Sequence, residues 1–239
     1  MKITKYPQSN FLIESGGKKI LIDPGNLTFA KHSVDDFGPL DAVLITHQHP
    51  DHLDKEAVRK LIERGVPMYG NHDVASQFEK EPFDITKVFH ENEFEVAGFK
   101  IKPVDLPHFQ GLWCETCNQK ITPDTINEDK RCKLHPDQEP KKVDGPPNTG
   151  YIINDTFFHP GDGIHLEGYS VKNAAIPIGG PTVDYDMAWK LVKALNAQLV
   201  VPIHYSIAIF GADPKEFSER NPLGVKVAIL EDGGDLEIS

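Results

Sequence analysis

"THQHPDH", residues 46–52, places three histidines and one aspartate directly after the apolar run "DAVLI", residues 41–45. Turn residues bound this run, which predicts a strand over Asp41 to Thr46 that is buried on both faces. Protonated histidines would repel one another there, and neutral ones would be polar groups that are costly to bury without partners. Imidazole and carboxylate are ligands that dications such as Zn²⁺ prefer. The segment therefore predicts a metal site at the end of a buried strand.

The spacing within this cluster suits two ions. Side chains two residues apart in an extended segment point the same way, so His47 and His49 can hold one ion. Asp51 and His52 follow as the chain turns toward a helix with Asp54 as its N-cap, and they can hold a second ion. The alternative is a polar loop that is merely rich in histidine. We favour metal because four ligand side chains meet at one strand-to-helix turn.

Further candidate ligands follow other apolar runs. His108 comes after "FKIKPVDLP", Asp162 after "TFFHPG" and His204 after "QLVVPI". Each is a ligand type placed where a predicted strand ends. The sequence therefore predicts that distant strand ends complete the site that the histidine cluster begins.

The rest of the chain indicates strands joined by tight turns and, later, strands alternating with helices. Turn residues 16–17, 97–98 and 154–155 predict three hairpins, and residues 226–239 predict a fourth that closes the chain. Helical periodicity appears after Asp54 and over "DYDMAWKLVKAL". This order predicts a single α/β domain over residues 1–239 in which helices cover mixed sheets.

"THQHPDH", with "LIDPG" before it and His108, "HPGD" and "PIHY" after it, resembles the metallo-β-lactamase superfamily of metal-dependent hydrolases. The resemblance covers nearly the whole chain apart from residues 109–148. "GYII", "HPGD", "PIGG" and "VVPIHY" are similar to the branch near L-ascorbate-6-phosphate lactonase. The resemblance implies a four-layer αββα sandwich with a dinuclear site along one edge. It also implies the ligands: His47, His49 and His108 for one ion, Asp51, His52 and His204 for the other, and Asp162 bridging both.

A water or hydroxide shared by two dications has a lowered pKa and is a nucleophile at physiological pH. This predicts a hydrolase acting on a small ester, lactone or phosphate-bearing substrate, with two catalytic ions that are zinc, manganese or iron. Asp51 would bind metal and orient the nucleophile. His165 either contacts substrate or protonates a leaving group, or it is a solvated loop histidine. Asp23 either holds a ligand histidine from outside or only caps a turn. His72 and His159 are weaker candidates for function.

Residues 109–148 form a compositional break that is rich in Pro, Lys, Asp and Glu, and they predict an inserted loop module. All three cysteines lie there, Cys114 and Cys117 as C-x-x-C, then Cys132 and His135 as C-x-x-H after fourteen intervening residues. The pattern resembles a zinc knuckle with Cys₃His closure. The alternative, a redox C-x-x-C, normally opens a helix in a βαβ unit. We predict one structural zinc, because the module has too few apolar side chains to offset its ordering entropy.

The composition of the chain limits the kinds of partner that we expect it to bind. Its 239 residues carry a formal net charge of −11, so nucleic acid is not expected as a partner. The longest apolar stretch, "LVVPIHYSIAIF", is too short to span a bilayer, and the start shows no signal peptide. Three cysteines fit a disulfide framework poorly, so a reducing cytoplasm is the default. We expect a small-molecule substrate, and the sequence leaves a homo-oligomer open.

Three alternative functions are weighed against a small-molecule hydrolase. A nuclease or phosphodiesterase of the same fold would usually carry RNA-gripping modules, which an acidic chain of this kind does not show. A non-enzymatic scaffold that docks a protein partner through the zinc insert would not need a complete ligand set. An oxidative di-iron enzyme would usually need an electron-carrying domain, for which this chain has no room. The complete ligand set favours the hydrolase.

Overall fold

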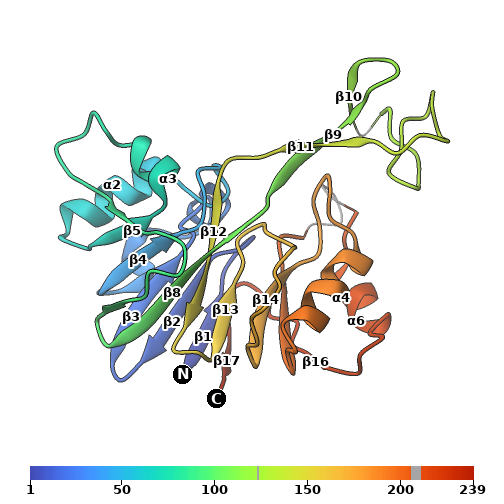
Figure 1. Ribbon diagram of the computed structural model, residues 1–239. Helices are drawn as coiled ribbons and strands as arrows, with labels where there is room; N and C mark the ends of the chain where they lie inside the picture. Colours follow the sequence, from blue (N-terminus) through green and yellow to red (C-terminus); the bar gives the residue numbers. More distant parts are fainter. Residues whose placement is uncertain (123, 206–210) are drawn as a thin grey trace.

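The computed structural model describes residues 1–122, 124–205 and 211–239, and these residues form four layers. Two mixed β-sheets lie face to face, and helices cover the outer face of each sheet (Figure 1). The two chain termini lie side by side at one edge of the sheets (Figure 1). The predicted αββα sandwich is therefore confirmed.

The first sheet of the described structure has seven strands in the order β17-β1-β2-β3-β4-β5-β6. β2 and β3 form the first predicted hairpin, whose turn places Gly16 and Gly17 at φ 58° and 76°, a conformation that glycine adopts without steric cost. β4 is the strand predicted before the histidine cluster, and it is buried along its whole length between β3 and β5. The strands are β1 (Lys2–Lys5), β2 (Phe11–Ser15), β3 (Lys18–Ile22), β4 (Ala42–Ile45), β5 (Met68–Gly70), β6 (Thr86–Lys87) and β17 (Gly234–Glu237).

The second sheet, counted over the same described ranges, also has seven strands, in the order β16-β15-β14-β13-β12-β8-β7. The predicted turn between β12 and β13 places Asn154 and Asp155 at φ 50° and 52°, and the backbone N–H of Thr156 closes it on the carbonyl oxygen of Ile153 at 3.0 Å. The strands are β7 (Phe94–Val96), β8 (Phe99–Leu106), β12 (Asn148–Ile153), β13 (Phe157–His159), β14 (Asn173–Pro177), β15 (Leu199–Ile203) and β16 (Lys226–Val227).

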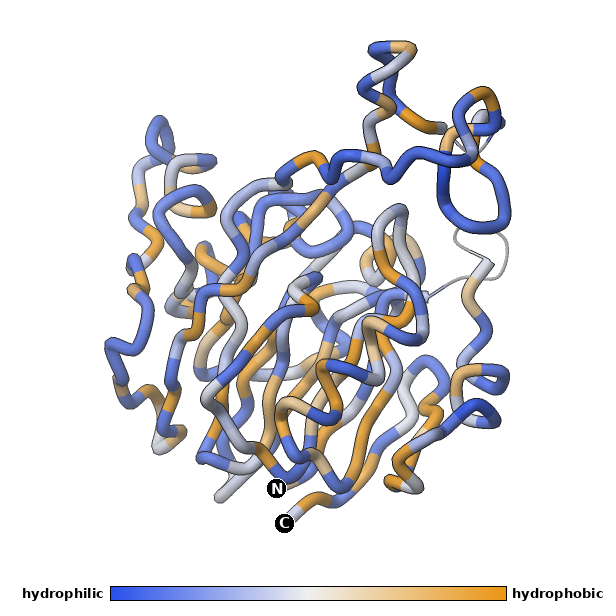
Figure 2. Tube along the Cα trace, turned by 45° about the vertical axis from the view of Figure 1, so that its right-hand side comes forward, coloured by the Kyte–Doolittle hydropathy of each residue, from blue (hydrophilic) through white to orange (hydrophobic). Residues whose placement is uncertain are grey.

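The two sheets bury one apolar core between them. Phe11 and Ile13 of the first sheet belong to the same buried cluster as Tyr151 and Phe157 of the second. Figure 2 shows hydrophobic residues concentrated along the strands in the middle of the molecule. Burying one such large side chain stabilises the fold by roughly 1.5–3 kcal/mol, so this core fixes how the strand ends are placed.

Helices cover the outer sheet faces, and the two longest described helices begin at side-chain caps. The Asp54 carboxylate accepts hydrogen bonds from the backbone of Glu56 and Ala57, so the predicted N-cap is confirmed. Asp184 caps the second predicted helix in the same way through the backbone N–H of Met187. In the part of the chain that the structure describes, no helix is long and apolar enough to cross a membrane. The helices are α1 (Asn26–Phe29), the 3₁₀ helix η1 (Val34–Phe37), α2 (Lys55–Glu63), α3 (His72–Ser76), α4 (Tyr185–Ala194) and α6 (Pro214–Glu219).

The predicted closing hairpin over residues 226–239 is wrong. β16 pairs in parallel with β15 of the second sheet, whereas β17 pairs antiparallel with β1 of the first sheet. The segment between them crosses from one sheet to the other, so the two strands never pair with each other. Local turn residues indicated a hairpin here, but the outer strands of both sheets offered longer-range partners.

The insert forms a small sheet of its own rather than only loops. β9 (Phe109–Cys114) pairs with both β10 (Gln119–Ile121) and β11 (Lys141–Asp144). Because β8 and β12 also pair antiparallel, the insert continues one hairpin outward beyond the body of the sandwich (Figure 1). Its buried cluster is small and consists of Leu112, Cys114, Ile121 and Cys132.

Gly25 packs closely against the backbone of the histidine cluster, and this contact can be tested by substitution. A Cβ added at Gly25 would lie 1.7 Å from the carbonyl oxygen of Asp51. Gly25→Ala should therefore displace the turn that carries Asp51 and His52 and lower the midpoint of thermal unfolding. The control is Gly111→Ala, whose Cβ would meet only the flexible Lys120 side chain, at 3.2 Å. Equal unfolding midpoints for the two variants would contradict this packing argument.

Candidate metal centre

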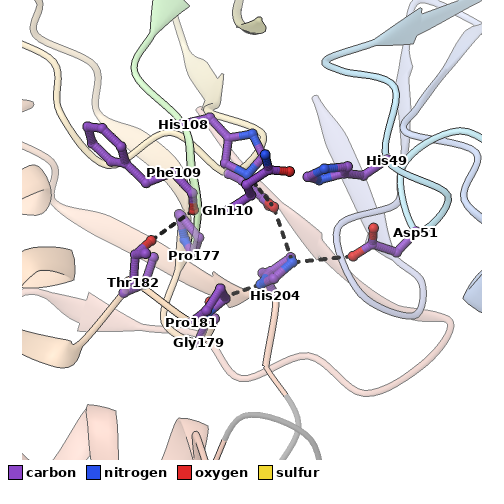
Figure 3. A pocket seen from close by; sticks show the side chains of 13 residues that line it. His49, Asp51, His108, Phe109, Gln110, Pro177, Gly179, Pro181, Thr182 and His204 are labelled. Atoms are coloured by element: carbon purple, nitrogen blue, oxygen red, sulfur yellow. Dashed lines mark hydrogen bonds and ion pairs between the residues drawn. The ribbon is translucent and has the colours of Figure 1, made fainter. Parts of the chain in front are cut away.

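The predicted ligands converge at one edge of the sandwich from four separate strand ends. His47, His49, Asp51 and His52 follow β4, and His108 follows β8. Asp162 follows β13, and His204 follows β15. Figure 3 shows His49, Asp51, His108 and His204 directed toward the same hollow. Ligand atoms lie within 4.8 Å of one another in two groups, namely His47, His49, His108 and Asp162, and then Asp51, His52 and His204.

Asp162 lies between the two groups. Its carboxylate oxygens are 3.1 Å from Nε2 of His52 and 3.2 Å from Nε2 of His204. The same carboxylate is 3.7 Å from Nε2 of both His47 and His108. One carboxylate therefore faces imidazoles of both groups, which is the arrangement that a shared ligand of two ions needs.

Hydrogen bonds to Nδ1 orient three of the imidazoles. His52 Nδ1 is 2.7 Å from the carboxylate of Asp23, and His204 Nδ1 is 2.9 Å from the carbonyl oxygen of Gly179. His47 Nδ1 is 3.1 Å from Oγ1 of Thr46. An acceptor at Nδ1 keeps the proton there and leaves the lone pair on Nε2. The three Nε2 atoms are the ones that face the centre.

Asp23 lies behind the histidine cluster, on the far side of the His52 ring from the centre. Its side chain is fully buried, and one carboxylate oxygen accepts the backbone N–H of Thr46 at 2.8 Å. The other oxygen accepts the Thr46 hydroxyl at 2.8 Å and contacts His52. Asp23 therefore connects the "LIDPG" segment to two residues of the histidine cluster.

Burial and neighbouring charges act in opposite directions on these groups. Burial, together with the nearby His52, lowers the pKa of His47 well below its ordinary value. Burial disfavours ionised Asp162, yet the nearby His204 and His52 hold the pKa of that carboxyl well below its usual range. Burial also disfavours protonated His52, but Asp162 and Asp23 outweigh it and raise the pKa of His52 well above its ordinary value. The carboxylates thus call for a compensating positive charge, which a cation supplies.

Two buried polar atoms without hydrogen-bond partners indicate whether the residues present fit a metal. His52 Nε2 and Asp162 Oδ1 lie 3.1 Å apart, yet within the described structure neither forms a hydrogen bond. Leaving a buried polar atom unsatisfied costs about 1–3 kcal/mol. Nitrogen and carboxylate oxygen donors are the set that first-row dications accept, so an ion at this position would satisfy both atoms. The residues present fit the implied metal pair.

A pocket of about 170 Å³ opens onto these ligands. Phe109 and Gln110, at the base of the insert, form part of its wall (Figure 3). Thr182 and Val183 form another part, and the Thr182 hydroxyl donates to the carbonyl oxygen of Phe109 at 2.9 Å. Lys130, from the middle of the insert, donates to the carbonyl oxygen of Val183. The insert is therefore in contact with the pocket wall at two points.

The predicted substrate-contacting residue His165 is not brought to this centre. Its side chain is exposed and lines a separate hollow with Glu167 and Lys190. The residues on either side, Ile164 and Leu166, are buried, so the histidine between them faces outward. His165 has no part in the function proposed below.

One supporting residue, Asn148, was missed in the sequence, and His159 was only a weaker candidate there. Asn148 accepts the backbone N–H of Asp162 at 3.2 Å and donates to the carbonyl oxygen of Pro160 at 2.9 Å, which fixes the "HPGD" turn. His159 supports the same turn, because its Nδ1 accepts the backbone N–H of Gly161 at 3.2 Å, and its Nε2 lies 2.7 Å from the carbonyl oxygen of Ser9. A polar residue at the start of a buried strand, such as Asn148, is a signal that could have been used.

The cysteines form a second convergent group. Sγ of Cys114 lies 3.3 Å from Nδ1 of His135, and Sγ of Cys132 lies 3.8 Å from the same atom. Cys117 and Cys132 have their sulfurs 3.9 Å apart, and all three thiols are free of disulfides. Backbone hydrogen bonding from Cys117 lowers the pKa of Cys114 to about 6, whereas the neighbouring Cys114 raises that of Cys117 to about 11. Three sulfur atoms and one imidazole this close together form a donor set that can hold a metal ion.

Comparison with known proteins agrees with this geometry. Residues 2–204 match the family described as "Beta-lactamase superfamily domain". A UPF0173 metal-dependent hydrolase of Pyrococcus furiosus is 30% identical over 245 residues, which cover 100% of both chains. Protein Rv0786c of Mycobacterium tuberculosis is 27% identical over 214 residues, covering 87% of this chain and 85% of that protein. The solved structure of the metallo hydrolase Igni18 from Ignicoccus hospitalis has a TM-score of 0.71 at 25% identity and covers 100% of this chain and 99% of that one. This chain therefore belongs to the β-lactamase superfamily of metal-dependent hydrolases.

Proposed function

We propose that this protein is a dinuclear metal-dependent hydrolase that acts on a small ester, lactone or phosphate-bearing substrate. One observation carries the proposal: the Asp162 carboxylate lies 3.1–3.7 Å from Nε2 of four imidazoles that belong to two ligand groups. Such a carboxylate can serve two ions at once. The proposed first ion is held by His47, His49 and His108, and the second by Asp51, His52 and His204.

The residues of the candidate metal centre have distinct roles in this proposal. Two bound dications would lower the pKa of a water molecule and polarise the scissile bond. Asp162 sets the spacing of the two sites. Asp51, which lines the pocket, holds the second site and orients the nucleophile by accepting its proton in a hydrogen bond. Asp23 keeps the proton of His52 on Nδ1, so that Nε2 stays available as a ligand.

The donor set supports zinc first, with manganese or iron as alternatives. Imidazole suits zinc and iron, and carboxylate suits manganese as well. Affinity alone therefore does not select one ion, and supply in the cell would decide among them. A reducing cytoplasm is the proposed location, because it keeps the three thiols of the insert available as ligands.

The pocket supports a small substrate. Its volume of about 170 Å³ is below the range of ~300–1,000 Å³ that is typical of drug-sized ligands. No lysine or arginine is among the described residues that line it, which disfavours a nucleic-acid backbone as the substrate. The relation to the L-ascorbate-6-phosphate lactonase branch stays a prediction. Hydrolysis assays of the metal-loaded and the chelator-treated protein on lactones, esters, phosphodiesters and RNA test the proposal, which fails if none is cleaved in a metal-dependent way.

We further propose that Cys114, Cys117, Cys132 and His135 hold one structural zinc. Their ligand atoms lie within 4.8 Å of one another, and two of the thiols belong to the small buried cluster of the insert. A cluster of this size cannot order some forty residues by apolar burial alone, so a metal would supply the missing stability.

Asp162→Ala should lower the rate of hydrolysis at least about a hundredfold, because the proposed shared ligand is lost. The fold should persist, since the side chain lies at the edge of the sandwich. Circular dichroism, elemental analysis and turnover on the best substrate of the panel measure the three effects. Asp155→Asn, which removes a carboxylate at an exposed turn and tolerates its left-handed backbone, is the control. Wild-type turnover by Asp162→Ala with both ions bound would refute the shared role.

Replacing Cys117 and Cys132 with Ser should remove one zinc per chain, because hydroxyl groups are poor zinc ligands at neutral pH. Residues 109–148 should then become sensitive to protease, while the His/Asp centre keeps its two ions. Activity should fall through disorder of the pocket wall. Elemental analysis and limited proteolysis of the double variant and of a Glu115→Gln control measure this. Equal metal content in the wild type and the double variant would instead support the redox interpretation of the C-x-x-C pair.

A further inference from the structure

Three residues outside the predicted ligand set, Gln8, Ser9 and Asn10, connect β1 to β2 beneath the metal centre. All three are buried, with exposed fractions of 8%, 0% and 0%. The sequence "QSN" gave no indication of function, and none of the three side chains is a predicted ligand. Their contacts nevertheless reach every segment that carries the second group of ligands.

The contacts of this segment are specific. The Asn10 side-chain amide donates to the carbonyl oxygens of Ile22 and Asp23, at 2.7 and 3.1 Å. The carbonyl oxygen of Ser9 contacts His159, which supports the "HPGD" turn. Residues 8–10 therefore fix the backbone on which two parts of the centre stand.

Gln8 makes the two contacts closest to the ligands. Its side-chain Nε2 donates to Oδ2 of Asp51 at 3.2 Å, and its carbonyl oxygen accepts the backbone N–H of His204 at 3.3 Å. Asp51 and His204 belong to the same ligand group, and their own side chains are 3.3 Å apart. One residue thus touches two of the three members of that group.

The backbone of Gln8 is held in a conformation that favours glycine. Its φ is 64°, in the left-handed region, where a residue with a Cβ pays a steric cost. Such conformations persist where the surroundings over-determine them, and they concentrate at functional sites. A glycine would suit this backbone better, but it would lack the side-chain amide that reaches Asp51.

The chemistry of an amide suits this position. A carboxylate oxygen has two lone pairs, so Oδ2 of Asp51 can accept from the amide and still present a lone pair toward an ion. A neutral donor restrains rotation of the carboxylate without competing in charge with a dication. A lysine here would compete, and an aspartate would repel Asp51.

We propose that Gln8 is a positioning residue for the second ion, acting through Asp51 and His204. This inference rests on the proposed dinuclear function. Partners of this kind, hydrogen-bonded to a ligand from outside the metal shell, typically change metal affinity or activity by 10–100-fold when they are removed. Gln8 should therefore raise the affinity of the second site for its ion and leave the affinity of the first site unchanged.

Two substitutions distinguish the effect of the amide hydrogen bond from the effects of side-chain packing and backbone strain. Gln8→Met keeps the length of the side chain and the strained backbone but removes the donor. Gln8→Gly removes the donor and relieves the backbone. Both variants should lose one ion at a chelator concentration about 10–100-fold lower than the wild type, with the remaining ions retained. Elemental analysis after dialysis against graded chelator counts the ions without any activity assay, and circular dichroism checks that each variant folds. Gln77→Ala, a surface glutamine bonded to Lys55, is the matched control.

A third variant shows which ion responds. His204→Ala should empty the second site by itself, and adding Gln8→Met to it should cause no further loss. If Gln8→Met retains its ions as the wild type does, the inference is overturned. It is also overturned if Gln8→Met loses an ion but Gln8→Gly retains it, because packing or backbone strain would then explain the loss. A wild-type protein that binds a single ion at the His/Asp centre would instead overturn the dinuclear proposal, and this inference with it.

Discussion

The structure depends on one constraint: several imidazoles and two carboxylates are brought together at a largely buried sheet edge. Such groups are costly to remove from water, and their net charge shifts with every proton gained or lost. The fold meets this cost with an outer layer of hydrogen bonds, from Asp23, Thr46 and Gly179 to the rear of the rings. The remaining atoms face one another at the centre, where a cation is the natural partner.

Strand geometry explains why this edge can hold the ligands. β4 and β15 are both buried along their whole length, so their ends are fixed by the core rather than by the loops that follow. The residues that directly follow β3 and β15 have a left-handed backbone: Asp23 and His204 both have φ 51°. Left-handed backbone at non-glycine residues costs about 1–3 kcal/mol each. The sandwich therefore spends part of its stability on holding side chains at fixed positions.

The strands, the hairpin turns and the candidate ligand positions could be predicted because they depend on local signals, whereas the four-layer arrangement was implied by the family resemblance. Apolar runs ending in His108, Asp162 and His204 each mark a strand end, and turn residues mark the hairpins. The partners of β16 and β17 could not be predicted, because strand pairing across two sheets leaves no local trace. Gln8 and Asn148 were missed for a related reason. Their role arises from contacts 43 and 14 residues away in the chain.

The insert joins the body of the sandwich directly beside the candidate metal centre. It leaves the body between β8 and β12, which are already paired, so its two ends emerge side by side. The backbone N–H of Gly145 donates to the carbonyl oxygen of His108 at 2.8 Å, directly behind a predicted ligand. A Cβ at Gly145 would lie 2.6 Å from Nδ1 of that histidine, so only glycine permits this approach. The insert and His108 therefore share one hairpin, which connects the Cys₃His group through the backbone to a predicted ligand of the His/Asp centre.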